Sequence, residues 1–339
     1  MKRIEYIDAL RGFTMILVVF AHVETFALSI EPNSTFLSAL FISFRMPLFF
    51  FISGYISQKR SCINNLREWS ASVGKKIKVQ LLPTLFLGTI YTYFYLHSNF
   101  YEFITDSAKL GYWFTVCLLL MFIVLYSINI LIKNLNNPQK IVVLAIISML
   151  LYALQTVFNN GDRLTMLGNI FCLHRFFMYF HFFVLGHIAA MCKDSFNRFL
   201  NNEYIITSAI LVFTVLFYIS INYNNIRWCY LISFPLLGYA GIIVVYNYFK
   251  VHQDSFSSNK RIGRILQYIG KRTLDIYLLH YFFLPQIPQL KLFLSNPANT
   301  VIELSVCIVL SLMIVCICLV VSNILRTSPV LAKLLFGVK

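Results

Sequence analysis

The sequence predicts an all-α, polytopic integral membrane protein with about ten transmembrane helices. Of its 339 residues, 59% are hydrophobic and 12% are charged, whereas about a quarter of the residues in a soluble domain are charged. Apolar runs of about 20 residues, the length that crosses a bilayer, recur from one end of the chain to the other. Because the polar breaks between them are short, we expect a single transmembrane domain over residues 1–339, with no separate soluble domain.

The expected membrane spans are the apolar runs between successive polar breaks. These spans cover residues 8–30, 36–57, 79–97, 111–132, 140–158, 169–191, 204–221, 228–249, 272–294 and 301–325. The first span follows the basic residues Lys2 and Arg3, as a signal peptide would. However, Asp8, Arg11 and His22 interrupt its apolar stretch, so we expect a retained helix. An even number of spans places both termini on one side of the membrane.

The Lys and Arg residues are distributed unequally between the two sides. Twenty-one of the 28 fall in segments on the side of the termini, four fall on the opposite side and three lie within spans. Cytoplasmic segments of membrane proteins carry the excess of Lys and Arg, so we expect both termini to be cytoplasmic. Nucleic-acid binding would instead require these residues on one solvated face, so topology explains the net charge of +15 better.

Two of the cytoplasmic segments, residues 58–78 and 250–271, are longer than a turn requires and rich in basic residues. One interpretation is that they are solvated loops facing anionic lipid head groups. The other is that they attract a phosphorylated cytoplasmic substrate.

The eight cysteines lie mostly within apolar runs and lack the spacing of a zinc site. We therefore interpret them as packing residues and expect neither disulfides nor a bound metal.

Charged and ionisable residues inside the spans indicate where a functional site lies. A charge at the bilayer centre costs about 2.5–3.5 kcal/mol on insertion scales, so each one needs a partner or a function. Arg11 and His22 are 11 residues apart, which places both on one face of a helix and about 16 Å apart along its axis. Asp8 precedes Arg11 by one turn and can pair with it.

Two further spans contribute residues to the expected site. Arg45 lies two residues before Pro47, which should kink the second helix, at about the same depth as His22. In the ninth span, Thr273, Tyr277 and His280 share one helical face. Since we found no equal number of buried carboxylates, we expect an excess of positive charge and hence an anionic ligand.

The sixth span carries three histidines, His174, His181 and His187, on a broad common stripe. The simplest expectation for these residues is a hydrogen bond to a neighbouring helix.

Five sequence features together resemble the membrane-bound acyltransferase-3 family, whose members O-acylate bacterial cell-surface glycans and some small molecules. They are Ile7-Asp-Ala-Leu-Arg-Gly12, the Arg11-x10-His22 spacing, Phe44-Arg-Met-Pro-Leu-Phe-Phe-Phe-Ile-Ser-Gly54, Tyr112-Trp-Phe114 and Gly270-x-x-Thr-Leu-x-Ile-Tyr-x-x-His280. At Thr273 the family more often has Ser. The resemblance extends from the first span to the ninth.

This resemblance implies a membrane O-acyltransferase of the bacterial cytoplasmic (inner) membrane. Its donor would be acyl-CoA, usually acetyl-CoA, used as a substrate and not as a permanently bound cofactor. Its acceptor would be a hydroxyl group of a cell-surface or lipid-linked glycan.

Each candidate residue then takes a role in acyl transfer. We assign His22 as general base and Arg45 as electrostatic stabiliser or donor anchor. We expect Arg11 to bind the phosphates of acyl-CoA, assisted by Lys75 and Lys76. The candidates for acceptor binding, or for orienting His22, are the residues of the ninth span: Thr273, Tyr277 and His280.

Three alternatives stay open at this point. A covalent acyl-His intermediate could replace general-base catalysis. A secondary transporter of an anionic metabolite would also gather Arg and His near the midplane, although such folds often contain inverted repeats. A non-catalytic partner of a glycan-export system would explain the helices but not the buried arginines.

Overall fold

The computed structural model describes residues 4–58, 63, 65–158, 165–222 and 227–337, and every regular element among them is helical. The chain is therefore all-α over this part, as the sequence predicts. It divides into two compact units. The first comprises Met1–Ile52 and Cys192–Val320, and the second comprises Ser53–Met191 and Val321–Lys339.

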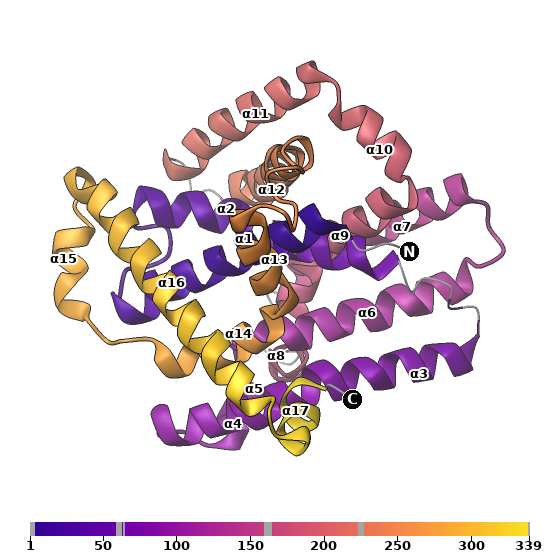
Figure 1. Cartoon of the computed structure of the whole chain (residues 1–339). Coiled ribbons are helices and arrows are strands. Elements are labelled where there is room, and N and C mark those ends of the chain that lie inside the picture. Colours follow the sequence, from indigo (N-terminus) through magenta and orange to yellow (C-terminus); the bar gives the residue numbers. More distant parts are fainter. Residues whose placement is uncertain (1–3, 59–62, 64, 159–164, 223–226, 338–339) are drawn as a thin grey trace. The chain divides into compact units, whose positions relative to one another are not determined.

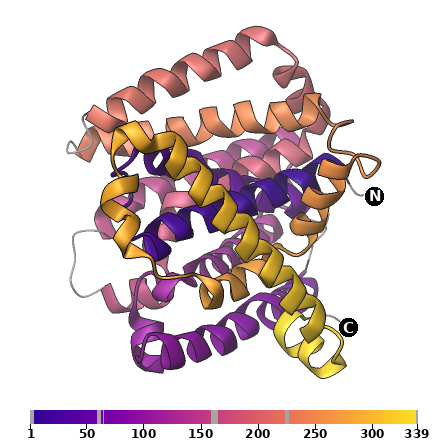
Figure 2. The ribbon, with the colours of Figure 1, turned by 60° about the vertical axis from the view of Figure 1, so that its left-hand side comes forward.

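The first unit contains the N-terminal helices and most of the C-terminal half of the chain. Its elements are α1 (Glu5–His22), η1 (Val23–Ala27), most of α2 (Phe36–Ser57), α10 (Lys193–Leu200), α11 (Glu203–Asn222), α12 (Arg227–Val251), α13 (Arg261–Lys271), α14 (Thr273–Leu279), η5 (His280–Phe283), η6 (Pro288–Leu290), α15 (Lys291–Leu294), η7 (Pro297–Asn299) and most of α16 (Thr300–Leu325). Within it, α11 and α12 lie side by side and α13 packs against α1 (Figures 1 and 2).

The second unit contains the middle of the chain and its C-terminal helix. Its elements are α3 (Leu66–Lys76), η3 (Ile77–Leu81), α4 (Leu82–Tyr95), α5 (Phe100–Thr105), η4 (Lys109–Gly111), α6 (Trp113–Leu131), α7 (Asn137–Phe158), α8 (Thr165–Ile170), α9 (Leu173–Met191) and α17 (Pro329–Phe336). Here α7 and α6 pack against α9, and α17 packs against α4.

Seven stretches of helix in the described part of the chain are long and apolar enough to cross a membrane. They are Glu5–Ala27, Phe36–Ser57, Trp113–Leu131, Asn137–Gln155, Glu203–Asn222, Leu231–Val251 and Pro297–Leu325. An eighth candidate combines Leu173–Met191 with Lys193–Leu200. The chain is therefore a multi-pass membrane protein, while the count of about ten spans and the cytoplasmic termini stay predictions.

The expected continuous helix over residues 272–294 is wrong. In its place are the seven-residue helix α14, the 3-10 turn η5 and further short elements. Pro285 and Pro288 explain the interruption, because proline lacks the amide that an α-helix needs and clashes with the preceding turn.

Although broken, this segment runs alongside α1 for most of its length. Thr273 contacts Arg11, His280 contacts His22, and the Ile287 amide donates to the Ala27 carbonyl at 2.8 Å. From residue 11 to residue 27, a helix rises about 24 Å. The segment therefore follows α1 in the same direction, which is the direction that the predicted topology requires.

Two glycines allow the backbones of α1 and α13 to touch. A Cβ atom at Gly12 would lie 2.0 Å from the Leu266 carbonyl oxygen, and one at Gly270 would lie 1.9 Å from the Asp8 carbonyl oxygen. Only glycine fits either position. Residues 261–271, expected to be a loop, thus form a helix that packs against α1 and fixes the start of α14 beside it.

Candidate active site

The helix α1 carries the two residues that define the Arg11-x10-His22 spacing. Arg11 lies in its second turn, and His22 is its last α-helical residue. From Val23 the backbone widens into the π-helix η1, a rare geometry that occurs frequently at functional sites. His22 is only partly buried, which leaves part of its imidazole accessible.

His22 and His280 form the central contact of the site. The His22 Nδ1 and His280 Nε2 atoms are 2.7 Å apart, and the two rings are stacked with an interplanar angle of 10°. His280 is fully buried. Its other ring nitrogen, Nδ1, lies 3.0 Å from the Ile276 carbonyl oxygen.

These contacts determine which nitrogen of His22 can accept a proton. A carbonyl oxygen only accepts hydrogen bonds, so His280 Nδ1 must be the donor to Ile276. In neutral His280, Nε2 is then an acceptor, and it receives the proton of His22 Nδ1. The lone pair of His22 consequently lies on Nε2, the atom that faces away from His280.

Tyr281 contacts the same Nε2 atom and was missed by the sequence reasoning. Its hydroxyl oxygen lies 3.3 Å from His22 Nε2, and its side chain is buried. Residue 281 follows His280 directly, so a regular helix would place the two side chains about 100° apart. The change to 3-10 geometry at His280 removed the periodicity signal that could have found it.

Arg45 and two carboxylates lie around this histidine pair. Arg45, from α2, is close enough to act electrostatically on both His22 and Glu24. Glu24 is buried in η1 and also interacts with buried Glu303 of α16, which accepts a 2.7 Å hydrogen bond from the Thr35 hydroxyl. The expectation of too few buried carboxylates overlooked these two, because Glu24 interacts with Arg45 and Glu303 interacts with Glu24.

Arg11 is held by two partners on the first unit. Its Nη2 donates to the Thr273 hydroxyl at 3.0 Å, and its Nη1 lies 3.8 Å from the Asp8 carboxylate. About a quarter of the Arg11 side chain, 27%, remains exposed. Thr273, which was expected to bind the acceptor, thus accepts a hydrogen bond from Arg11, and its role in acceptor binding stays a prediction.

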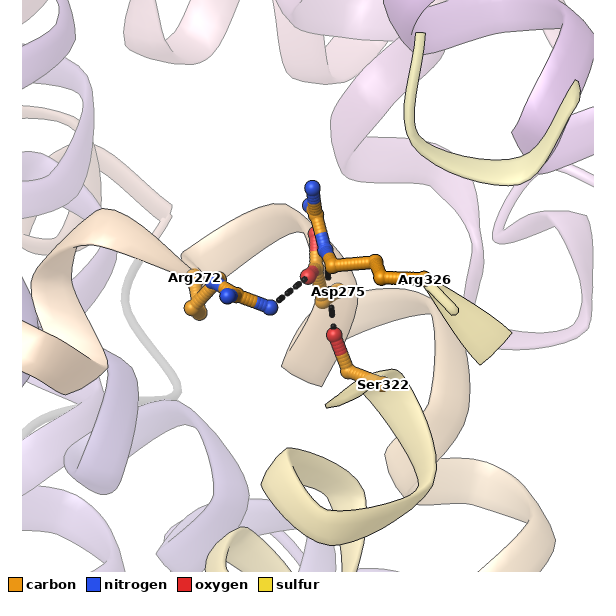
Figure 3. Close-up of polar contacts among 4 residues, drawn as sticks. All are labelled: Arg272, Asp275, Ser322 and Arg326. Atoms are coloured by element: carbon orange, nitrogen blue, oxygen red, sulfur yellow. Dashed lines mark hydrogen bonds and ion pairs between the residues drawn. The ribbon is translucent and has the colours of Figure 1, made fainter. Parts of the chain in front are cut away.

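Two other residues of α14, Tyr277 and Asp275, are also buried. Tyr277 is buried with its ring centroid 5.9 Å from that of His280. Arg272, just before the helix, lies 3.4 Å from the buried carboxylate of Asp275 (Figure 3). Since acidic residues in the first turn interact favourably with the helix dipole, this ion pair stabilises the start of α14.

A family model described as an acyltransferase domain, that of the acyltransferase-3 family, matches residues 4–322. The chain belongs to this family. No curated protein and no solved structure matches the chain. The protein is therefore a membrane acyltransferase, and the match covers the described residues of the first unit and most of the second unit.

The second unit of this acyltransferase contains the two lysines expected to assist donor binding, and they differ in environment. The Lys76 ammonium lies over the Phe122 ring at 3.4 Å from its centroid, a cation–π contact that turns it towards α6. Lys75 is exposed and lines a groove together with residues of α17. Only Lys75 is thus available to a ligand in that groove.

The histidines of α9 have local partners within the second unit. His187 Nδ1 lies 2.8 Å from the Ser57 hydroxyl. Because this hydroxyl donates to the Gly54 carbonyl, it accepts a hydrogen bond from His187. His181 packs against Tyr152 with ring centroids 4.8 Å apart. His187 thus makes the kind of hydrogen bond that was expected for these histidines, whereas the contact of His181 with Tyr152 is one between rings. His174 is exposed.

The acyltransferase holds no group of three or more potential metal ligands among the residues that the structure describes. The candidate catalytic groups are therefore the His22–His280 pair, the guanidinium of Arg45 that acts on His22, and the partly exposed Arg11. A base of this kind removes a proton from a hydroxyl, and a guanidinium stabilises negative charge on oxygen.

Proposed function

We propose that this membrane acyltransferase transfers an acyl group, preferably acetyl, from cytoplasmic acyl-CoA to a hydroxyl of a cell-surface or lipid-linked glycan in the bacterial inner membrane. The observation that carries the proposal is the 2.7 Å contact between His22 and His280. It leaves the His22 Nε2 lone pair directed away from its partner, as a general base for an alcohol requires.

In the proposed reaction, His22 Nε2 accepts the proton of the acceptor hydroxyl. The hydroxyl oxygen attacks the thioester carbonyl carbon and forms a tetrahedral oxyanion. When the carbon–sulfur bond breaks, the CoA thiolate leaves and takes the proton from His22. The acceptor hydroxyl replaces or shares the contact that Tyr281 makes with Nε2.

His280 acts in this scheme as a positioning residue. Its Nε2 accepts the Nδ1 proton of His22 and thus keeps Nε2 of His22 unprotonated between turnovers. The same logic orients the histidine of a Ser-His-Asp triad, in which a buried acceptor fixes the tautomer of the base. Of the ninth-span residues expected to bind the acceptor or to orient His22, we assign His280 to orienting His22 and Tyr277, beside the histidine pair, to acceptor binding.

We assign Arg45 and Arg11 to two different anionic groups, the oxyanion of the reaction and the phosphates of CoA. Arg45 acts electrostatically on His22, and we assign it to stabilising the oxyanion that forms beside this residue. Arg11 is about 16 Å away along α1, a separation that the extended pantetheine arm of CoA can span, and its exposed part is available to a phosphate. Since Lys76 packs against Phe122, the proposal for the donor rests on Arg11.

The test is acyl transfer by the purified protein in lipid nanodiscs. Labelled acetyl-CoA and a glycan extract should give label on the glycan and free CoA in equal amounts, and NMR of surface glycans should lose acetyl signals in cells without the protein. Longer acyl-CoA donors, tested in parallel, establish the acyl preference. If purified protein releases no CoA from any acyl-CoA with any glycan extract, the donor or the acceptor has been misassigned.

A further inference from the structure

A groove in the second unit has basic and apolar walls. It has a volume of about 1300 Å³ and lies between the α3–η3–α4 segment and α17. Its basic residues are Arg67, Lys75, Lys78 and Lys333, and all four side chains are exposed. None of the described residues that line it is acidic.

The apolar wall extends from the groove to the surface. Leu82, Val330 and Leu334 line the groove, and their exposed fractions are 48%, 73% and 45%. Leu82 begins α4, a predominantly apolar helix. Apolar side chains this exposed indicate contact with an apolar partner, and in a membrane protein that partner is a lipid chain.

The N-terminus of α3 and both ends of α17 are capped. The Asn65 side chain accepts a hydrogen bond from the Glu68 amide at the start of α3. The α17 helix starts at Pro329 and ends at Gly337, which adopts φ +60°. Arg326 stacks on Phe336 at 4.5 Å and donates to the Ser322 hydroxyl (Figure 3). These caps and contacts stabilise the ends of the helices that form the groove.

We infer that this groove binds a phospholipid with an anionic head group. The four cations suit a phosphate-containing head group, each basic residue near an anionic lipid contributing about fivefold in affinity. The apolar wall suits the acyl chains. Acyl-CoA fits less well, because the described lining residues include no aromatic ring on which an adenine could stack.

Gly74 gives a way to fill the groove without changing its charge. It lines the groove near the C-terminal end of α3, and a Cβ atom there would meet nothing within 4 Å. Leucine at this position therefore occupies groove volume without disturbing packing. Gly168 in α8 has the same open surroundings and lies outside the groove lining, so Gly168→Leu is the matched control.

The experiment is native mass spectrometry of the purified protein in detergent with equal amounts of phosphatidylglycerol and phosphatidylcholine of identical chains. The wild type should retain phosphatidylglycerol preferentially. The combined variant Lys75→Gln, Lys78→Gln and Lys333→Gln should lower that preference by up to about 10²-fold. Gly74→Leu should lower retention of phosphatidylglycerol, and Gly168→Leu should leave it unchanged.

Two outcomes would overturn the inference. In one, both groove variants retain phosphatidylglycerol as the wild type does, at melting temperatures that show they are folded. In the other, free CoA displaces the lipid from the wild type, which would assign the groove to the donor. Neither readout requires acyl transfer, so the result is independent of the proposed function.

Discussion

His22 makes contacts through both of its ring nitrogens, with His280 on one side and Tyr281 on the other. A histidine that served only to join two helices would need a single hydrogen bond. Contacts at both nitrogens fit either a base or a structural residue, and substitutions at this position separate the two roles.

We expect His22→Ala to reduce acyl transfer by about 10²–10⁴-fold, the usual contribution of a general base, while acyl-CoA binding is retained. His22→Gln keeps hydrogen bonding but cannot take up a proton, so it should be as inactive as His22→Ala. Initial rates and donor binding measured on the same preparations check this. A Gln variant with most of the wild-type rate would make His22 structural, and an acylated His22 trapped with donor alone would favour the covalent route.

At His280, the expectation concerns the tautomer of its neighbour. His280→Gln offers a carbonyl oxygen that can accept the Nδ1 proton of His22, whereas His280→Leu offers no acceptor. We expect the Leu variant to lose at least about tenfold in kcat, or ~1.4 kcal/mol, with little change in KM, and the Gln variant to recover part of that loss. Equal rates for the two variants would show that His280 contributes only packing.

Arg11 tests the donor part of the proposal. A guanidinium that binds phosphate bidentately contributes about 1.5–3 kcal/mol, so Arg11→Ala should raise the KM for acyl-CoA by about 10–10²-fold. Arg11→Lys keeps the charge but loses the two parallel hydrogen bonds, so its KM for acyl-CoA should lie between those of the wild type and Arg11→Ala. Thr273→Val, which removes only the 3.0 Å contact to Arg11, is the control for a purely structural effect. An unchanged KM in Arg11→Ala would leave Arg11 with a structural role, in contact with Asp8 and Thr273.

At the scale of elements, the packing of α1 on α13 depends on two positions without side chains. We expect Gly12→Ala to lower the melting temperature strongly, because its Cβ atom would lie 2.0 Å from a backbone oxygen and overpacking typically costs about 1–3 kcal/mol. Thermal unfolding in detergent measures this. Gly168→Ala, in open surroundings, should change stability little. If Gly12→Ala has the same melting temperature as Gly168→Ala, α1 and α13 separate more easily than the structure indicates.

Helical periodicity predicted which residues gather at the site. The 11-residue spacing of Arg11 and His22 and the depth of Arg45 follow from regular α-helix geometry, and α1 and α2 have that geometry up to His22 and around Arg45. Beyond those limits the same rule fails. From Val23 the structure has the π-helix η1, and its residue Glu24 interacts with Arg45, a contact that the sequence analysis did not predict.

Prolines and short helices account for the other differences between the sequence-based predictions and the structure. The hydropathy of residues 272–294 is that of a membrane span, but Pro285 and Pro288 divide it into short elements. The contact of Tyr281 with His22 depends on that division. Hydropathy also gave no indication that residues 261–271 pack on α1, because their role depends on the backbone approach at Gly270.

At the scale of the whole molecule, the unequal distribution of basic residues predicts the topology. Reporter fusions at Lys75 and Lys333 should report the cytoplasm, and a fusion near Asn296 should report the opposite side. A second outer marker, Asp162, lies outside the described residues. An extracytoplasmic signal at Lys333 would mean that the number of crossings is odd, and segment 272–294, which the structure divides into short elements, would be the first to re-examine.

The partners of α1 within the site have a consequence for biosynthesis. Arg11 and His22 bind residues 262 and 258 positions further along the chain. At about 5–20 residues per second, a ribosome needs roughly 10–50 s to make the intervening chain. During that interval a helix carrying a guanidinium and an imidazole lies in the bilayer without those partners. We therefore expect nascent chains that stop before Thr273 to be preferred substrates of chaperones and proteases in the membrane.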